Sequence, residues 1–230
     1  MQINAADTAF MLTATALVLI MTPGLAFFYG GLVGRRNVLA IMMQSFVSLG
    51  VSTVLWVTVG FSLSFGSDLG GVIGNPTDFF LLMGIAPGDV YPKLGIPVYL
   101  FAAYQLMFAV ITPALITGAF ADRMSFKAYL TFLVGWQLVV YYPFVHMVWG
   151  GGWLAEHVGV LDFAGGIVVH ALAGMAALAT VFFLGKRRAE PEPHNIPFVA
   201  LGTALLWFGW FGFNAGSALA VNEISALAFI

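Results

Sequence analysis

The chain has 230 residues, of which 61% are hydrophobic and only 8% are charged, and its mean hydropathy is +0.98. Soluble domains carry about 25% charged residues, so this composition is typical of a chain whose main solvent is lipid. The net charge of −2 and the absence of a basic cluster with interleaved aromatics argue against nucleic acid as a partner. Because the chain has no cysteine and no metal-like spacing of histidines, we expect neither disulfides nor a metal or cofactor.

Apolar runs of the length that crosses a bilayer as a helix, about 20 residues, follow one another along the whole sequence. No basic segment of the signal-peptide kind precedes the first run, which predicts a retained helix. The sequence therefore predicts an all-α polytopic protein with one membrane domain over residues 1–230. Six helices are expected, and a seventh begins near residue 224: 8–33, 38–65, 98–120, 126–149, 163–185 and 197–217.

The basic residues predict which side each connection faces, because Lys and Arg in short loops stay in the cytoplasm. Only Lys93 lies in the connections predicted to be outside, and the N-terminus then also lies outside. The other seven basic residues fall in alternate connections, predicted to be cytoplasmic: Arg35, Arg36, Arg123, Lys127, Lys186, Arg187 and Arg188.

Small residues four apart predict close helix packing, as in Gly30 with Gly34 and Gly212 with Gly216. This interpretation accounts for most of the glycines without assigning them a function.

Ionisable groups inside a membrane are costly, so those that the predicted helices retain are functional candidates. Asp162 can cap the start of the fifth predicted helix, or it can attract a cation. His170 is either a packed core residue or a neutral imidazole lining a narrow path. Four residues at a spacing of four predict one helix face: Asp162, Gly166, His170 and Gly174.

Aromatic residues at the ends of three predicted helices give further candidates. Trp149 is followed by three glycines, and it is either an interfacial anchor or a partner that offers its ring face to a cation. Phe213 and Ser217 share a face of the sixth helix, where Ser217 can accept a bond from an N–H donor. The third helix supplies Gln105 and Phe108, and Phe108 can pair with Phe213 as a gate or belong to the packed core.

Four segments combine glycines, aromatics and the candidate residues: Pro23-Gly-x-x-x-Phe-Tyr-Gly-Gly31, His146-Met-Val-Trp-Gly-Gly-Gly152, Leu161-Asp-Phe-Ala-Gly-Gly-x-Val-Val-His170 and Gly209-Trp-Phe-Gly-Phe-Asn-Ala-Gly-Ser217. In this order they resemble the signature stretches of the Amt/Mep/Rh ammonium transporters, most closely the Amt/Mep branch. The resemblance runs from the first helix to the C-terminus. It implies a recruitment site at Phe108, Trp149 and Ser217, a stacked gate of Phe108 and Phe213, an acidic residue near that site at Asp162, and the first of two pore histidines at His170.

The family resemblance also implies an assembly. Its members are non-enzymatic homotrimers in the cell membrane with one pore per subunit, built from eleven helices in two inverted halves. A regulatory PII-type protein docks on the cytoplasmic side of the full-length protein. The chain matches the first half only, so we expect half a pore, without a match for the second pore histidine or for the cytoplasmic tail.

The expected function is transport of ammonium or ammonia, in which the cation is recruited outside, deprotonated and passed along a hydrophobic pore past His170. An alternative is an ammonium-sensing membrane domain of a signalling protein. A third hypothesis, a hydrolase or proton pump using Asp162 and His170, is disfavoured because the sequence has no nucleophile motif, no metal spacing and no second buried acid.

Overall fold

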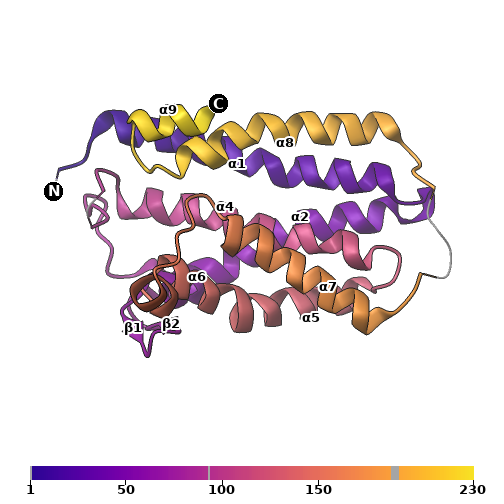
Figure 1. Ribbon diagram of the computed structural model, residues 1–230, viewed down its shortest axis with the longest axis horizontal. Coiled ribbons are helices and arrows are strands. Elements are labelled where there is room, and N and C mark those ends of the chain that lie inside the picture. The colour runs from indigo at the N-terminus through magenta and orange to yellow at the C-terminus, as the bar shows by residue number, and fades with distance from the viewer. Residues whose placement is uncertain (1, 93, 188–191) are drawn as a thin grey trace.

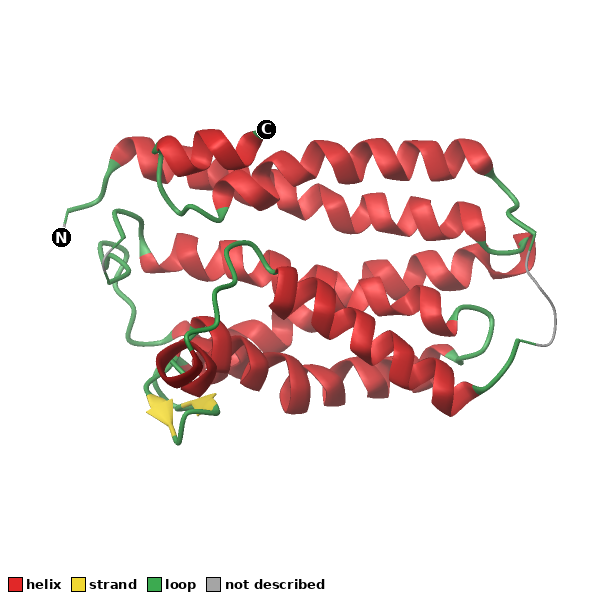
Figure 2. Ribbon diagram, in the orientation of Figure 1, coloured by secondary structure: helices red, strands yellow, loops and turns green. Residues whose placement is uncertain are grey.

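The computed structural model describes residues 2–92, 94–187 and 192–230, so the predictions for Lys93 and Arg188 lie outside the described residues. Within these ranges the chain is mostly helical with a single short hairpin, and six helices are long and apolar enough to cross a membrane, which confirms the predicted class (Figure 2). The α-helices and strands are α1 (Ala5–Leu32), α2 (Val38–Leu55), α3 (Phe61–Phe65), β1 (Asp68–Leu69), β2 (Ile73–Gly74), α4 (Val98–Phe120), α5 (Phe126–Trp136), α6 (Tyr142–Trp149), α7 (Leu172–Leu184), α8 (Ile196–Gly216) and α9 (Glu223–Phe229).

π-Helical turns were not predicted, and they interrupt three of the membrane spans. Two of them, Trp56–Gly60 and Gln137–Tyr141, join α2 to α3 and α5 to α6 without a break. The third, Gly166–Ala171, begins the span that continues as α7. Asp162 therefore precedes this span instead of lying on its face. The prediction that Asp162 shares a helix face with Gly166, His170 and Gly174 is therefore wrong.

The helices form a bundle in which α1 and α8 lie side by side and α4 runs through the middle (Figure 1). In the most apolar stretch of α4, 83% of the residues are buried, against 17% in the span that contains α7. The centre of the packed core is therefore α4, and α7 lies on the surface of the bundle.

The two ends of the bundle differ in charge and structure. The connections α1–α2 and α4–α5 lie together with the end of α7 and the start of α8 at one end, which we call the basic end (Figure 1). The β1–β2 hairpin, with Asp68 opposite Gly74, lies at the other end, which we call the hairpin end. At the basic end the Arg187 guanidinium donates to the carbonyls of Gly118 (3.0 Å) and Ala121 (3.3 Å), which satisfies acceptors at the C-terminus of α4.

Polar side chains at the helix starts explain where several spans begin. The Asn4 side chain accepts from the backbone N–H of Ala6 at 2.9 Å, and Asn195 accepts from Phe198 at 3.0 Å. Asn222 and Ser225 form a reciprocal capping box at the start of α9. These caps satisfy N–H groups that have no partner inside the helix.

Glycines bring α8 and α1 into close contact. A Cβ atom added to Gly212 would lie 2.6 Å from Cβ of Leu17, and one on Gly216 would lie 2.8 Å from Cβ of Ala14. The prediction of close helix packing at Gly212 and Gly216 is confirmed. For Gly34 it is wrong, because a Cβ there would meet no described atom within 4 Å.

Candidate cation site and pore segment

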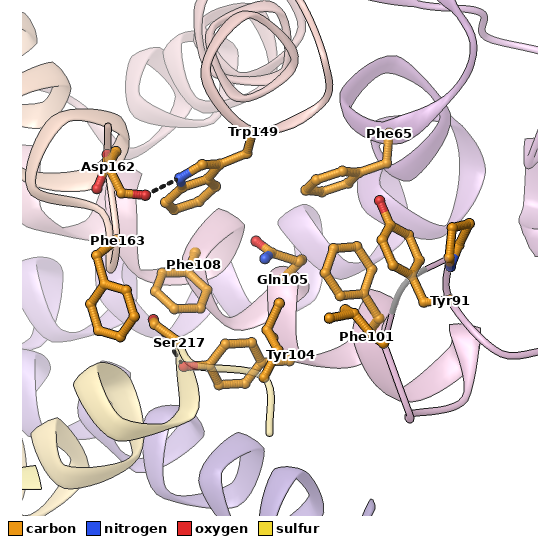
Figure 3. A pocket seen from close by; sticks show the side chains of 13 residues that line it. Phe65, Tyr91, Phe101, Tyr104, Gln105, Phe108, Trp149, Asp162, Phe163 and Ser217 are labelled. Carbon is orange, nitrogen blue, oxygen red and sulfur yellow. Dashed lines mark hydrogen bonds between the residues drawn. The ribbon is translucent and has the colours of Figure 1, made fainter. Parts of the chain in front are cut away.

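A cavity of about 430 Å³ lies at the hairpin end, bounded by α4, α6, the segment before α7 and the end of α8 (Figure 3). Most of its lining is aromatic. Three residues predicted as a recruitment site, Phe108, Trp149 and Ser217, all line it, although they are far apart in the sequence. The remaining lining residues are Phe65, Tyr91, Pro92, Leu94, Phe101, Tyr104, Gln105, Asp162, Phe163 and Leu219.

Phe108 is the centre of the aromatic cluster beneath this cavity. Its ring centroid lies 5.8 Å from that of Trp149 and 4.6 Å from that of Phe213. Phe108 and Phe213 are each only 1% exposed, so the two rings close the base of the cavity. Their planes meet at 57°, so the pair is tilted, whereas the resemblance implied a stacked pair.

Trp149 ends α6 with its indole in the cavity (Figure 3). The indole N–H donates to the backbone carbonyl of Asp162 at 2.8 Å, which fixes the orientation of the ring. Because this bond uses the one donor of the indole, Trp149 can offer a ligand only its π-face. Such a face near a cavity suits a cation.

Asp162 holds the turn that leads into the next span. Its carboxylate accepts from the backbone N–H groups of Gly165 (2.7 Å), Ile167 (2.9 Å) and Val168 (2.8 Å). These are the bonds that the capping alternative requires, and they stabilise the negative charge at a helix start. Gly165 has a φ of 97°, which other residues rarely adopt, so the turn also depends on glycine.

Ser217 lies at the end of α8, and its hydroxyl donates to the carbonyl of Phe213 at 2.8 Å. The one proton of the Tyr104 hydroxyl has three acceptors within reach: the carbonyls of Gly212 (3.0 Å) and Phe213 (2.9 Å) and Oγ of Ser217 (3.3 Å). Since the Ser217 proton points to a carbonyl and its oxygen has two lone pairs, at least one lone pair is left to accept from a ligand.

His170 lies beyond Phe213 and does not line the cavity. Its imidazole is parallel to the indole of Trp210, with centroids 5.6 Å apart and an interplanar angle of 7°, and it lies 5.8 Å from the ring of Phe213. The aromatic contacts therefore run from Trp149 through Phe108 and Phe213 to His170.

The glycine run after Trp149 packs against the hairpin end. A Cβ on Gly150 would collide with the carbonyl oxygen of Ser64, and one on Gly152 would lie 2.6 Å from that of Gly71. Gly151 has a φ of 87°. A tight turn on a neighbouring backbone thus explains the three glycines.

Several residues of this region were not predicted. Tyr104 lies one turn before Phe108 on α4, a spacing that could have indicated a shared face. Trp210 lies in one of the four signature segments but was not singled out. Tyr91 comes from the long connection and stacks on Phe101 with centroids 3.8 Å apart, and burial raises its pKa to about 12. Its phenol therefore stays uncharged at neutral pH.

The chain is similar to known proteins over nearly its whole length. The family model described as Ammonium Transporter Family matches residues 9–230. The ammonium transporter of Mycobacterium tuberculosis is 47% identical over 253 residues, which cover 99% of this chain and 53% of that protein. The ammonium transporter of Aquifex aeolicus is 48% identical, with 100% of this chain and 54% of that protein covered. The chain spans about half the length of the curated relatives it matches.

Solved structures share the fold. Candida albicans Mep2 superposes with a TM-score of 0.88 and 36% identity, covering 99% of this chain and 51% of that one. A structure described as Sensor Amt Protein superposes with a TM-score of 0.89 and 31% identity, covering 97% of this chain and 57% of that one. With a family model matched over nearly its whole length, the chain belongs to the Ammonium Transporter Family.

Proposed function

We propose that the protein containing this chain transports ammonium or ammonia across a membrane, with the cavity at the hairpin end as the site that first binds the cation. One observation carries this proposal: Phe108, Trp149 and Ser217 line a single cavity, and Phe213 and His170 follow beyond its base. The protein acts as a pore and not as an enzyme.

The cavity offers ammonium two kinds of contact. The π-faces of Trp149 and Phe108 attract a cation, and a Trp face is the strongest of the aromatic partners. Ser217 accepts one N–H bond through a free lone pair. Together these contacts favour a small cation that also donates hydrogen bonds.

The second step takes the substrate past the closed pair Phe108 and Phe213 and separates it from its proton. Neutral ammonia then crosses an apolar path beside His170, whose imidazole can give or accept a hydrogen bond without carrying a permanent charge. An alkali cation can neither donate hydrogen bonds nor shed its charge by deprotonation. This difference gives the path its selectivity.

The membrane arrangement is part of the same proposal. The basic end lies in the cytoplasm of a cell-membrane protein, and the hairpin end and the N-terminus lie outside, because basic loops stay inside. The assembly is a homotrimer with one pore per subunit, and a PII-type protein docks at the cytoplasmic side of the full-length protein.

The test is uptake of labelled methylammonium by cells that express the complete gene and lack other ammonium uptake. We expect uptake that ammonium inhibits and potassium does not, and a loss of affinity in Trp149→Leu. Trp153→Leu serves as the control, because Trp153 lies four residues away and does not line the cavity. A complete protein that reaches the membrane and gives no ammonium-dependent flux would contradict the proposal.

A sensor is the second candidate, because one of the matched structures is described as Sensor Amt Protein. In a sensor the same cavity binds ammonium, and occupancy changes the activity of an attached signalling region. An ammonium-dependent signalling output without flux would favour this function over transport.

A further inference from the structure

His146, three residues before Trp149, is buried with an acceptor at each ring nitrogen. The side chain is 0% exposed. Its Nδ1 lies 3.1 Å from the carbonyl oxygen of Ser64, and its Nε2 lies 3.0 Å from a carboxylate oxygen of Asp68 in the hairpin. The imidazole thus links α6 to the end of α3 and to the first strand of the hairpin.

Both ring nitrogens of His146 take part in this link. A carbonyl oxygen can only accept, so Nδ1 donates to Ser64, while Nε2 shares a hydrogen bond with the carboxyl group of Asp68. A hydrogen bond to a carboxylate is stronger than one between neutral groups. The hydrogen bond from His146 lowers the pKa of Asp68, and this keeps the carboxylate ionised.

Backbone hydrogen bonds around His146 also join the end of α6 to the hairpin. The N–H groups of Gly150 and Gly152 both donate to the carbonyl of His146, at 3.0 Å each. The N–H of Trp153 donates to the carbonyl of Gly71 in the hairpin at 2.8 Å. The last turn of α6, which carries Trp149, is therefore fixed to the hairpin on one side.

Trp149 is held on its other side by the carbonyl of Asp162. A cation–π contact needs the cation within about 6 Å of the ring centroid, so a small rotation of the end of α6 would weaken it. A displaced ring would also lose its edge contact with Phe108.

We propose that Asp68 and His146 are positioning residues that hold Trp149 in its binding orientation, although neither lines the cavity. The hairpin then contributes to the affinity for the cation through the orientation of Trp149. The effect on affinity rests on the proposed transport function, whereas the effect on the orientation of Trp149 does not.

The test uses the complete protein with three substitutions, alone and combined with Trp149→Leu. Asp68→Ala leaves Nε2 of His146 without a partner, and Asp68→Asn restores one, because its amide can donate to a neutral imidazole. Asp89→Ala is the matched control, since Asp89 lies in the same connection but accepts from the backbone of Ala86, at 2.7 Å, and does not contact α6. The readouts are the KM for methylammonium and tryptophan fluorescence.

We expect Asp68→Ala to raise KM about ten-fold, the size of a lost charge-assisted hydrogen bond, with a smaller change in maximal uptake. Asp68→Asn should recover most of the affinity, and Asp89→Ala should match the wild type. In the Trp149→Leu background Asp68→Ala should have no further effect on KM, because it acts through the missing ring.

Fluorescence tests the positioning without transport. The emission of each protein minus that of its Trp149→Leu counterpart reports Trp149 alone, and Asp68→Ala should shift it while Asp89→Ala should not. The inference is overturned if Asp68→Ala leaves this emission unchanged, or if Asp89→Ala changes it equally. It is also overturned if Asp68→Ala raises KM in the Trp149→Leu background by the same factor as in the wild type. If the wild type shows no uptake, the proposed function fails, and the emission spectra still decide the positioning.

Discussion

The aromatic cavity at the hairpin end and the segment around His170 are built very differently. The cavity draws its lining from α3, α4, α6, the end of α8 and the long connection, and its base is nearly inaccessible. His170 is half-buried, and the aromatic neighbours that the described residues give it, Trp210 and Phe213, both come from α8. Trp210 is itself 38% exposed.

Under the proposed transport function, this difference predicts which region sets affinity and which sets throughput. A cation site needs several groups fixed around one position, and the cavity has them. A pore segment needs a low barrier and not tight binding, and His170 with its stacked neighbour offers a single polar group on an apolar face. We therefore expect affinity to depend on the cavity and throughput to depend on His170.

Phe213 belongs to both regions, so Phe213→Ala should give the largest effect. Removing a fully buried Phe costs about 3–5 kcal/mol, and here it would loosen Phe108 and His170 together. Thermal unfolding of the purified protein in detergent measures this loss. Trp207→Ala, on the exposed side of the same helix, is the control. Equal melting temperatures for the two variants would show that the regions are not joined through Phe213.

Asp162→Ala should give the next largest effect, about 2 kcal/mol, because three backbone N–H groups lose a charged acceptor. Asp162→Asn should lose less, since its amide oxygen still accepts, and Glu156→Ala should be near neutral. Thermal unfolding checks the order. If Asp162→Asn instead keeps full stability but loses methylammonium affinity as severely as Asp162→Ala, the carboxylate acts as a cation attractor and not mainly as a cap.

Ser217→Ala should raise the KM for methylammonium by about three-fold, the size of one modest hydrogen bond, and leave stability nearly unchanged. Thr203→Ala is a close control, because Thr203 also lies on α8 and donates to the carbonyl four residues earlier, at 2.8 Å. An identical KM for Ser217→Ala and the wild type would remove Ser217 from the site.

The smallest expected effect is a pH dependence of stability at the hairpin end. The pKa values of Asp68 and Asp78 are lowered from 3.8, chiefly by hydrogen bonds from His146 and Ser67 respectively. A carboxyl with a lowered pKa contributes stability that is present above 3.8 and is lost as pH falls below that value. Melting temperatures between about pH 2 and pH 5 should therefore fall less steeply with acid in Asp68→Asn, which loses the Asp68 contribution and keeps that of Asp78.

Hydropathy was sufficient to predict the six spans, because lipid requires long apolar helices with satisfied backbones. It could not predict the π-turns, which depend on local packing and not on composition, or that the helix after Asp162 begins only at Gly166. The candidate residues could be named from the four signature segments. Their partners could not, since the contact of Tyr104 with Ser217 and that of Asp68 with His146 join residues 113 and 78 positions apart.

The most direct test of the account compares Trp149→Leu with His170→Ala in methylammonium uptake at equal surface expression. We predict that Trp149→Leu raises KM about ten-fold with maximal uptake largely kept, the size of a lost cation–π contact of one to two kcal/mol. His170→Ala should change maximal uptake and leave KM within about two-fold, because His170 lies beyond the closed pair. An unchanged KM in Trp149→Leu, or a ten-fold change in KM in His170→Ala, would contradict the assignment of cation affinity to the cavity.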